Sequence, residues 1–393
     1  MEYNPFLPEV QENPYPYYAY LRQHAPAYEV PGVGLWVVSR HEDVLSIFRN
    51  PQLFSSTVYV NALVGEFNPF SPEAPAMIAS DPPSHTRLRK LVNRAFTPRR
   101  IASMEAHIGE VTNNLIEHAA AKPLFDLVKD LAEPLPVTVI AEMLGVEPER
   151  RHDFRRWSDA IITASKGMGV TAEEREQIPR DLAEFRAYFR DAIEKCRTQP
   201  GDNLLSDLVR AEEEKQTLTS EEILSLAVLL LVGGNETTTN LIGNAMLALL
   251  AYPDQLAQVQ ANRALVPNLV EEALRYDAPV QGSFRLTTQE VEIVGTKVPA
   301  GAVIMPLIGS ANRDERKFFD PDRFDILRNA EGHLAFIIGI HYCLGAQLAR
   351  LEAKAALETL LKRFSRFVCQ EQDLPRIGSV IIRGPKILPL VVR

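Results

Sequence analysis

The sequence has few cysteines, and their spacing excludes several kinds of site. Only three occur in 393 residues, at Cys196, Cys343 and Cys369. An odd number of widely spaced cysteines fits no disulfide framework, so we expect the protein to work in a reducing compartment. No Cys-x-x-Cys pair is present either, which argues against the common kinds of zinc site.

Long apolar runs and a positive net charge are also absent. The longest apolar run, residues 223–232, contains Ser225 and falls far short of the roughly 20 residues that a membrane span needs. The opening residues, MEYNPFLP, include neither a basic segment nor an apolar run, so we expect no signal peptide. A formal net charge of −9 argues against a general nucleic-acid binder. We therefore expect a cytoplasmic protein with no membrane span and no nucleic-acid partner.

The sequence also lacks a Gly/Ser-rich linker, a low-complexity tract and an internal repeat, so we predict a single domain over residues 1–393. The composition, 46% hydrophobic and 24% charged, is that of an ordinary globular protein with a large core. Helical patterns dominate, and strand patterns are few. We therefore predict a mainly α-helical fold, in which a large helical domain carries a small β-rich region.

The individual elements follow from periodicity and from glycine and proline breaks. The predicted helices cover residues 17–24, 41–49, several stretches within 101–210, 219–252 and the segment from about 346 to 364. The predicted strands cover residues 34–39, 291–294 and a short segment after 301, with 379–382 and 387–392 as a C-terminal pair.

Residues 54–80 form a long apolar stretch without a clear helix or strand pattern. Irregular loops of this length inside a compact domain are usually functional or disordered. The stretch is therefore either a lid or pocket wall, which its apolar side chains favour, or a mobile surface loop.

A strongly basic stretch follows in this acidic protein. Asp81, Pro82 and Pro83 precede it in the order that opens a helix, with the cap before the proline. Taken alone, the stretch is either a solvated face or a surface that neutralises buried carboxylates and binds an acidic partner. Its basic residues are His85, Arg87, Arg89, Lys90, Arg94, Arg99 and Arg100.

The helix predicted over residues 219–252 is long and contains an unusual interruption. It opens with the capping box Thr-Ser-Glu-Glu at 219–222 and spans roughly 45–50 Å at 1.5 Å per residue. Because it is apolar on most sides, it should cross the core. Its middle holds Gly-Gly-Asn-Glu-Thr-Thr-Thr at 233–239. This interruption is either a kink or packing site, or a groove where an acid and an alcohol deliver protons to a small molecule.

A short segment near the C-terminal end is the most informative of all. It runs Phe-Ile-Ile-Gly-Ile-His-Tyr-Cys-Leu-Gly over residues 336–345. Gly339 and Gly345 shape a loop that presents Cys343 just before a helix N-terminus, where partial positive charge favours the thiolate. A single thiolate on an apolar loop suits a haem iron held from one side. The fragment Cys343-Leu344-Gly345 taken alone would instead indicate a buried, inert core cysteine, which is the usual state of a free cysteine.

The whole Phe-x-x-Gly-x-His-x-Cys-x-Gly spacing resembles the haem-binding loop of the cytochrome P450 family, closest to its soluble bacterial branch. The resemblance extends from Asn-Pro-Tyr-Pro at 13–16 to Arg-Gly-Pro at 383–385. One residue departs from the pattern, because Ile337 stands where the family usually has glycine or another small residue. The resemblance implies a P450-like fold and haem b with Cys343 as the axial thiolate. It also makes Glu236 and Thr237 the acid–alcohol pair that delivers protons.

The same resemblance assigns the other site residues. Glu272, Arg275 and Arg323 would form a buried triad that supports the cysteine loop. The residues implied in haem binding are His85, Arg89, Gly233, Arg285, Phe336, His341 and Gly345. The residues implied in the substrate pocket are Leu229, Val280, Phe284, Ile381 and Ile382.

The implied activity is that of a haem-thiolate monooxygenase that inserts one oxygen atom from O2 into a hydrophobic small molecule. The substrate would be a terpenoid, steroid, fatty acid or macrolide-like compound. A ferredoxin or flavodoxin-like donor would supply electrons, docking near Arg87, Lys90, Arg94 and Arg99. Two alternatives stay open, a peroxide-driven enzyme, which needs no acid–alcohol pair, and a non-catalytic haem or small-molecule binding protein.

Overall fold

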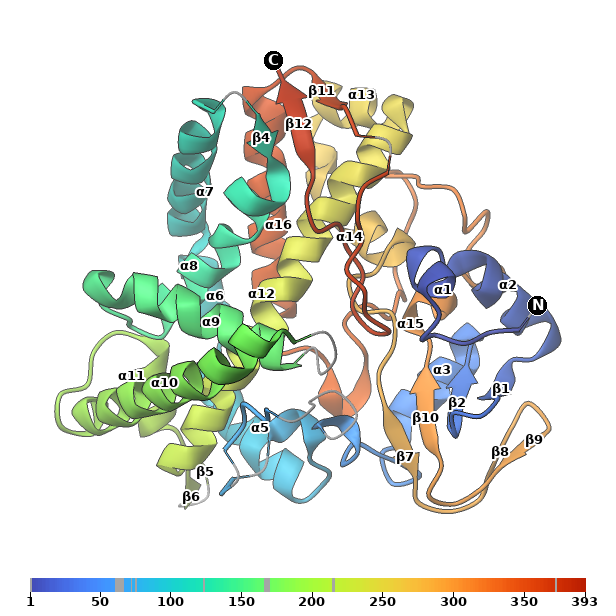
Figure 1. Ribbon diagram of the computed structural model, residues 1–393, viewed down its shortest axis with the longest axis horizontal. Coiled ribbons are helices and arrows are strands. Elements are labelled where there is room, and N and C mark those ends of the chain that lie inside the picture. The colour runs from blue at the N-terminus through green and yellow to red at the C-terminus, as the bar shows by residue number, and fades with distance from the viewer. Residues whose placement is uncertain are drawn as a thin grey trace. The chain divides into compact units, whose positions relative to one another are not determined.

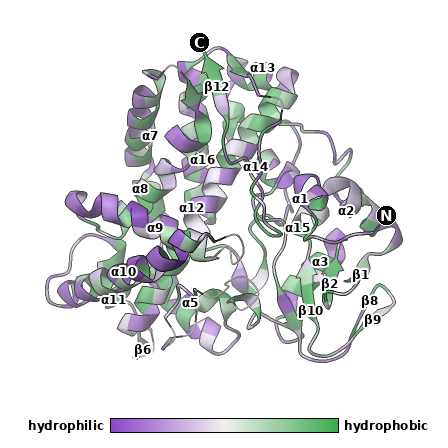
Figure 2. Cartoon of the chain, in the orientation of Figure 1, coloured by the Kyte–Doolittle hydropathy of each residue, from purple (hydrophilic) through white to green (hydrophobic). Residues whose placement is uncertain are grey.

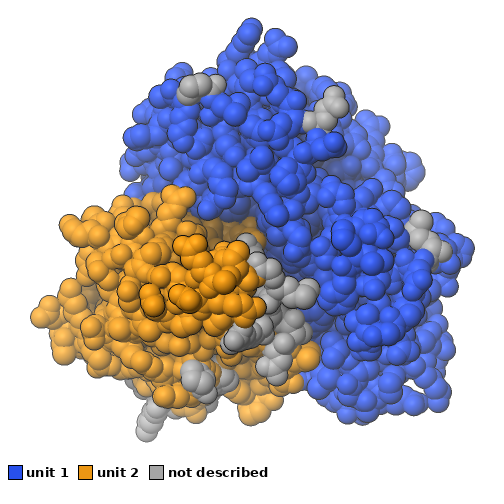
Figure 3. Space-filling view, in the orientation of Figure 1, with its two compact units in different colours: residues 1–55, 106–135, 237–393 blue, residues 56–105, 136–236 orange. Residues whose placement is uncertain are grey.

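The computed structural model describes residues 2–60, 67–71, 73–74, 76–122, 124–165, 170–213, 216–371 and 373–393. Helices predominate among them, which confirms the mainly α-helical prediction (Figure 1). The chain divides into two compact units (Figure 3). Unit 1 comprises Met1–Ser55, Ala106–Leu135 and Thr237–Arg393, and unit 2 comprises Ser56–Glu105 and Pro136–Glu236. The single domain stays a prediction.

Most of the helices lie where the sequence pattern predicted them. The described α-helices are α1 (Pro8–Glu12), α2 (Tyr15–His24), α3 (His41–Arg49), α5 (Ser84–Ala95), α6 (Pro98–Ser103), α7 (Glu105–Ala120), α8 (Pro134–Met143), α9 (Arg151–Ser165), α10 (Ala172–Thr198), α11 (Leu204–Arg210), α12 (Ser220–Ala251), α13 (Pro253–Ala261), α14 (Val266–Tyr276), α15 (Ile308–Ala311) and α16 (Ala346–Arg363). None of the described helices is long and apolar enough to cross a membrane.

The surface helices are amphipathic, which explains why they form where they do. On α7 the buried residues Ile108, Thr112, Ile116 and Ala119 follow each other at three- and four-residue spacing, so they share one face. Figure 2 shows hydrophobic and hydrophilic residues on the same helices, α7 and α10 among them. The apolar stripe of α7 therefore drives its packing onto the core.

The strands form a small β region. The larger sheet has the order β1 (Ala27–Val30), β2 (Leu35–Val38), β10 (Val303–Pro306), β7 (Arg285–Thr287) and β3 (Phe54–Ser55). In it β10 runs parallel to β2 and antiparallel to β7. The other strands are β4 (Phe125–Asp126), β5 (Glu212–Glu213), β6 (Gln216–Thr217), β8 (Val291–Ile293), β9 (Thr296–Val298), β11 (Phe367–Cys369) and β12 (Pro389–Val392).

The long central helix α12 is continuous over 32 residues, or about 48 Å. Its predicted capping box is present, because Glu222 N–H donates to Thr219 Oγ1 at 3.2 Å and Thr219 N–H donates to Glu222 Oε2 at 2.9 Å. The helix continues through the Gly-Gly-Asn-Glu-Thr-Thr-Thr stretch. Its residues up to Glu236 belong to unit 2, and those from Thr237 onward belong to unit 1.

The predicted C-terminal strand pair is wrong. The last strand, β12, pairs with β11 and β4 instead, and residues 379–382 contribute only an isolated bridge between Val280 and Ile382. The cause is local, because Ser379 Oγ accepts hydrogen bonds from the N–H groups of Ile381 and Ile382 at 3.2 and 3.1 Å. A hydroxyl that takes these donors leaves fewer of them for a strand ladder.

The start of the basic helix also differs from the prediction. Helix α5 begins at Ser84, and its N-cap position is Pro83, with no side-chain capping bond. The carboxylate of Asp81 accepts a hydrogen bond from Ser56 N–H at 2.9 Å instead. Its backbone carbonyl accepts from His85 N–H at 2.9 Å. Asp81 therefore anchors the preceding segment and does not cap the helix with its side chain.

Candidate functional site

The cysteine loop lies in unit 1 between a short 3-10 turn, Gly339–His341, and the N-terminus of α16. Cys343 N–H donates to the carbonyl of Phe336 at 3.0 Å, which closes the loop on itself. The Cys343 side chain is half-buried and forms no disulfide. Gly345 is the N-cap of α16. The thiol therefore lies near the positive end of a helix, which favours its thiolate form.

Two residues of this loop have left-handed backbone conformations. Gly339 has φ = +73°, and a Cβ there would lie 2.7 Å from the carbonyl oxygen of Phe48. Glycine is thus the residue that this position accepts without a shift in the backbone. Ile337 has φ = +55°, which is an outlier for a β-branched side chain. The one departure from the expected loop sequence therefore lies at a position that would suit glycine.

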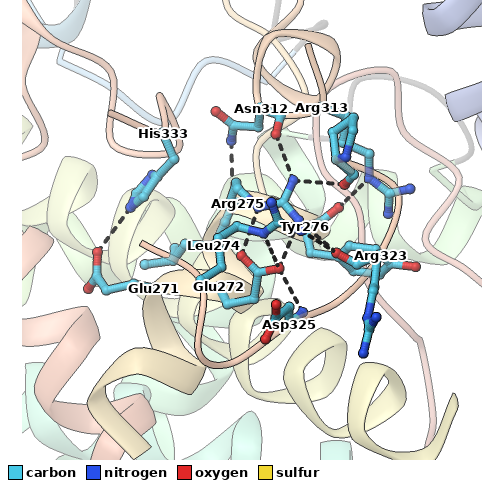
Figure 4. Close-up of polar contacts among 12 residues, drawn as sticks. Glu271, Glu272, Leu274, Arg275, Tyr276, Asn312, Arg313, Arg323, Asp325 and His333 are labelled. Carbon is cyan, nitrogen blue, oxygen red and sulfur yellow. Dashed lines mark hydrogen bonds and ion pairs between the residues drawn. The ribbon is translucent and has the colours of Figure 1, made fainter. Parts of the chain in front are cut away.

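A buried ion pair on α14 supports the segment that leads to this loop. Glu272 and Arg275 are 0% exposed and form a bidentate pair with N–O distances of 2.7 and 2.8 Å (Figure 4). Arg275 also donates to the backbone carbonyls of Asn312, Pro321 and Arg323 at 2.9, 2.9 and 3.2 Å. The pair thus fixes an irregular stretch through its backbone.

The third member of the predicted triad is corrected. Arg323 contributes its carbonyl, while its side chain is 55% exposed and lies 4.0 Å from Asp254. Figure 4 shows this side chain pointing away from Glu272. The second guanidinium on Glu272 is that of Arg328, 11% exposed, at 3.3 Å. Both arginines lie in the same irregular segment, so chain spacing alone does not reveal which one turns inward.

The interruption of α12 has different surroundings at its two glycines. A Cβ at Gly234 would lie 2.8 Å from Cδ1 of Ile140, so this glycine allows close packing. A Cβ at Gly233 would meet no described atom within 4 Å. Glu236 and Thr237 follow and are half-buried. The packing interpretation thus holds for Gly234, while no side chain of the described residues packs within 4 Å of where a Cβ of Gly233 would lie.

Within unit 1, the buried carboxyl group of Glu352 on α16 contacts a threonine of α12. Glu352 is 1% exposed, and its side chain hydrogen-bonds to Thr238, which is also buried. Burial raises the pKa of Glu352 to about 8, and the Thr238 hydrogen bond opposes this only in part. Sequence reasoning missed this residue. The signal was a glutamate in helical register with Leu348 and Ala356, both on the buried face of α16.

The basic side chains of helix α5 in unit 2 differ in burial and in pairing. His85 is 2% exposed, and burial together with the charge of Arg89 lowers its pKa to about 4, so it is neutral at pH 7. Arg87 pairs with Glu222 of the α12 capping box. Lys90 and Arg94 are exposed, as is Arg99 of α6.

The remaining predicted residues of unit 1 form two groups. Arg285 is buried, donates to Ser283 Oγ at 2.9 Å, and has its guanidinium 5.3 Å from the ring centre of Phe48. The apolar segments near residues 280–284 and 381–382 meet, because Gln281 N–H donates to Ile381 O at 2.6 Å. Phe284 and Ile381 are buried, and Val280, Ile382 and His341 are half-buried. Leu229, also half-buried, lies in unit 2.

Comparison with known proteins identifies the family. The sequence model described as "Cytochrome P450" matches residues 9–387. The chain is 41% identical to cytochrome P450 107B1 of Saccharopolyspora erythraea, over 92% of this chain and 90% of that protein. The structure of cytochrome P450 CYP109Q5 from Chondromyces apiculatus superposes with a TM-score of 0.93 at 42% identity, covering 100% of this chain and 98% of that one.

A second solved structure carries a ligand in its name. CYP109E1 from Bacillus megaterium in complex with corticosterone superposes with a TM-score of 0.88 at 36% identity, covering 97% of this chain and 99% of that one. Together, these matches show that the chain belongs to the cytochrome P450 family, whose members are monooxygenases that bind haem through an axial cysteine thiolate.

Proposed function

We propose that Cys343 is the axial haem ligand of this monooxygenase and that the enzyme inserts one oxygen atom from O2 into a hydrophobic small molecule. The observation that carries the proposal is the geometry of the cysteine loop. A half-buried thiol stands at the N-terminus of α16, on a loop closed by its own N–H bond to Phe336 and shaped by Gly339. Of the three cysteines, Cys196 is buried against Ser206 and Cys369 lies on β11.

The cysteine loop and the basic residues assigned by resemblance have the chemistry that haem needs. Phe336, Ile338, Ile340 and Leu344 are apolar and half-exposed, which suits the face of a macrocycle. Its propionates are anions that need positive partners when buried. By resemblance, Arg89 and Arg285 supply that charge, and His341 belongs to the same set. His85 completes the set by resemblance and would donate a hydrogen bond to a propionate.

The middle of α12 serves the reaction in this proposal. When bound, haem supplies the binding and activation of O2. By resemblance, Gly233 leaves room for that small molecule, and a Cβ there would meet no atom of the described residues within 4 Å. Glu236 holds a proton on its carboxyl group, and the Thr237 hydroxyl passes it onward. Both side chains are half-buried, so water can resupply the proton while bulk solvent is kept away.

The substrate belongs to the apolar class of terpenoids, steroids, fatty acids and macrolide-like compounds. Its pocket residues by resemblance are apolar without exception, and the segments that carry Val280, Phe284 and Ile382 are held together by backbone bonds. The related CYP109E1 structure contains corticosterone, which makes a steroid-sized substrate the first to screen. Binding is measured by the spin-state shift of the Soret band.

The electrons come from an acidic ferredoxin or flavodoxin-like donor that docks on the exposed basic residues Lys90, Arg94 and Arg99. Arg87 contributes less, because Glu222 already neutralises it. Charge reversal at Lys90 and Arg94 should raise the KM for the donor and weaken its salt dependence. Charge reversal at Lys297, whose side chain is 74% exposed on β9 of the other unit, is the control. Equal KM values in all variants would contradict this docking surface.

The test of the mechanism is Thr237→Ala. The variant should consume electrons and O2 while forming less product, because its proton path is interrupted, and Thr237→Ser should restore the coupling. Product formed per electron consumed is the measurement. Unchanged coupling in Thr237→Ala would favour the peroxide-driven enzyme or the non-catalytic binder. Product formation with peroxide alone, at the rate seen with the donor, would point to the former.

A further inference from the structure

Three polar side chains of unit 1 meet beside Phe336, the first residue of the cysteine loop. Glu271 comes from α14, His333 from the segment before the loop, and Arg350 from α16. The Arg350 guanidinium holds the Glu271 carboxylate with N–O distances of 2.5 and 3.0 Å. His333 Nε2 lies 3.0 Å from the same carboxylate, and Figure 4 shows the two side chains facing each other. One carboxylate thus joins three segments of chain.

The contacts of this cluster fix the charge of Glu271 and the tautomer of His333. Burial would raise the pKa of Glu271, but the hydrogen bonds of His333 and Arg350 and the Arg350 charge outweigh it and lower the pKa to about 2. Ala335 N–H donates to His333 Nδ1 at 3.2 Å, so Nε2 carries the hydrogen that the ring gives to Glu271. Glu271 is therefore ionised around neutral pH, and its contact with His333 uses the Nε2–H tautomer of the ring.

The cluster contacts the cysteine loop at its first residue and at the residue directly before Cys343. The Arg350 guanidinium lies 4.4 Å from the ring centre of Phe336, and the His333 ring lies 6.2 Å from it. Arg350 also hydrogen-bonds to the side chain of Tyr342, the residue before the cysteine. The Phe336 carbonyl in turn accepts the Cys343 N–H at 3.0 Å. Movement of Arg350 would therefore release two residues that precede the ligand in the chain, Phe336 and Tyr342.

We propose that Glu271, His333 and Arg350 act as a clamp that positions Cys343 as a thiolate ligand. This inference rests on the proposed function, because it gives these three residues the role of holding the haem ligand in place. The clamp differs from the Glu272–Arg275 pair, which binds backbone carbonyls farther upstream. Partners that orient a metal ligand without touching the metal typically change affinity or activity by 10–100-fold when removed. The clamp residues are positioning residues and do not touch substrate.

The experiment follows the ferrous carbon monoxide complex over time. Arg350→Met keeps the length of the side chain against Phe336 but removes its charge and its forked hydrogen bonds, and Glu271→Gln removes only the carboxylate charge. Lys297→Met, from the exposed pair with Glu290, is the control for loss of one positive charge. The red-shifted Soret band of thiolate ligation should decay at least about tenfold faster in the first two variants and at the wild-type rate in the control.

Two further variants separate positioning from general stability. Arg350→Lys retains the charge and should decay at an intermediate rate. The double variant with Glu271→Gln and Arg350→Met should decay no faster than Arg350→Met alone, because the carboxylate acts through the guanidinium. The reduction potential should shift in Arg350→Met, while the thermal midpoint of far-UV circular dichroism should stay close to that of the control.

The outcomes are distinguishable. Thiolate bands of wild-type lifetime in both Arg350→Met and Glu271→Gln would overturn the clamp. Loss of the band only in parallel with global unfolding would overturn it too, since that result describes a structural role. If Arg350→Met fails to fold, Glu271→Gln and Arg350→Lys decide between the same outcomes. A wild-type protein without the red-shifted band would instead contradict the proposed function.

Discussion

The buried carboxyl group of Glu352 makes stability depend on pH in a predictable direction. The side chain is 1% exposed, and burial raises its pKa from 4.5 to about 8 despite the hydrogen bond with Thr238. Among the described residues its Oε1 has no hydrogen-bond partner. The group is therefore protonated in the folded protein at neutral pH, whereas the unfolded chain ionises it.

The sign and size of the effect follow from this difference. Between pH 4.5 and about 8 the folded state binds one more proton at Glu352 than the unfolded state does, so the free energy of unfolding falls as pH rises through that window. Each pKa unit corresponds to about 1.36 kcal/mol, so the whole window represents on the order of 5 kcal/mol. Glu352→Gln cannot ionise and loses this dependence.

The assay compares urea unfolding of the wild type, Glu352→Gln and Glu358→Gln at pH 5 and pH 9. Glu358 is a half-exposed residue of the same helix and controls for loss of a carboxylate. The glutamine variant at 352 should gain several kcal/mol relative to the wild type between the two pH values, and the control should gain none. A protonated carboxyl band in the infrared spectrum at pH 7 should vanish in Glu352→Gln. Parallel pH dependence in the wild type and this variant would refute the reasoning.

Three further predictions concern stability, read as the shift of the thermal midpoint. Gly384→Ala should cost about 1–3 kcal/mol, because its Cβ would lie 2.0 Å from Oδ1 of the buried Asn240, and no shift would contradict this packing. Ile337→Gly should be neutral or stabilise by up to about 1 kcal/mol by relieving φ = +55°, and a clear loss would contradict the strain. Arg328→Ala should cost about 1–3 kcal/mol and Arg323→Ala under about 0.5, and the reverse order would restore Arg323 to the triad.

Local patterns predicted the elements that carry local signals. The capping box at Thr219 and Glu222 and the unbroken apolar pattern beyond it predicted α12 almost to the residue. The glycines around Cys343 predicted a loop before a helix, and Gly339 has the positive φ that such a loop needs. In both cases the determining interactions join residues a few positions apart.

Distant contacts could not be predicted in this way. Glu271, His333 and Arg350 are far apart in sequence, and each is an ordinary surface-type residue by composition. The choice between two arginines for the pair on α14 depends on how an irregular segment folds back. The hydroxyl of Ser379 took backbone donors that the strand pattern had assigned to a ladder. Such competition between side chain and backbone is not visible in hydrophobic periodicity.

The absorption spectrum of the reduced protein with carbon monoxide measures most directly whether Cys343 binds haem as a thiolate. A strongly red-shifted Soret band is expected in the wild type and in Cys196→Ser and Cys369→Ser, and it should be absent in Cys343→Ser. A wild-type haem band without that shift, or a shifted band that persists in Cys343→Ser, would contradict the assignment.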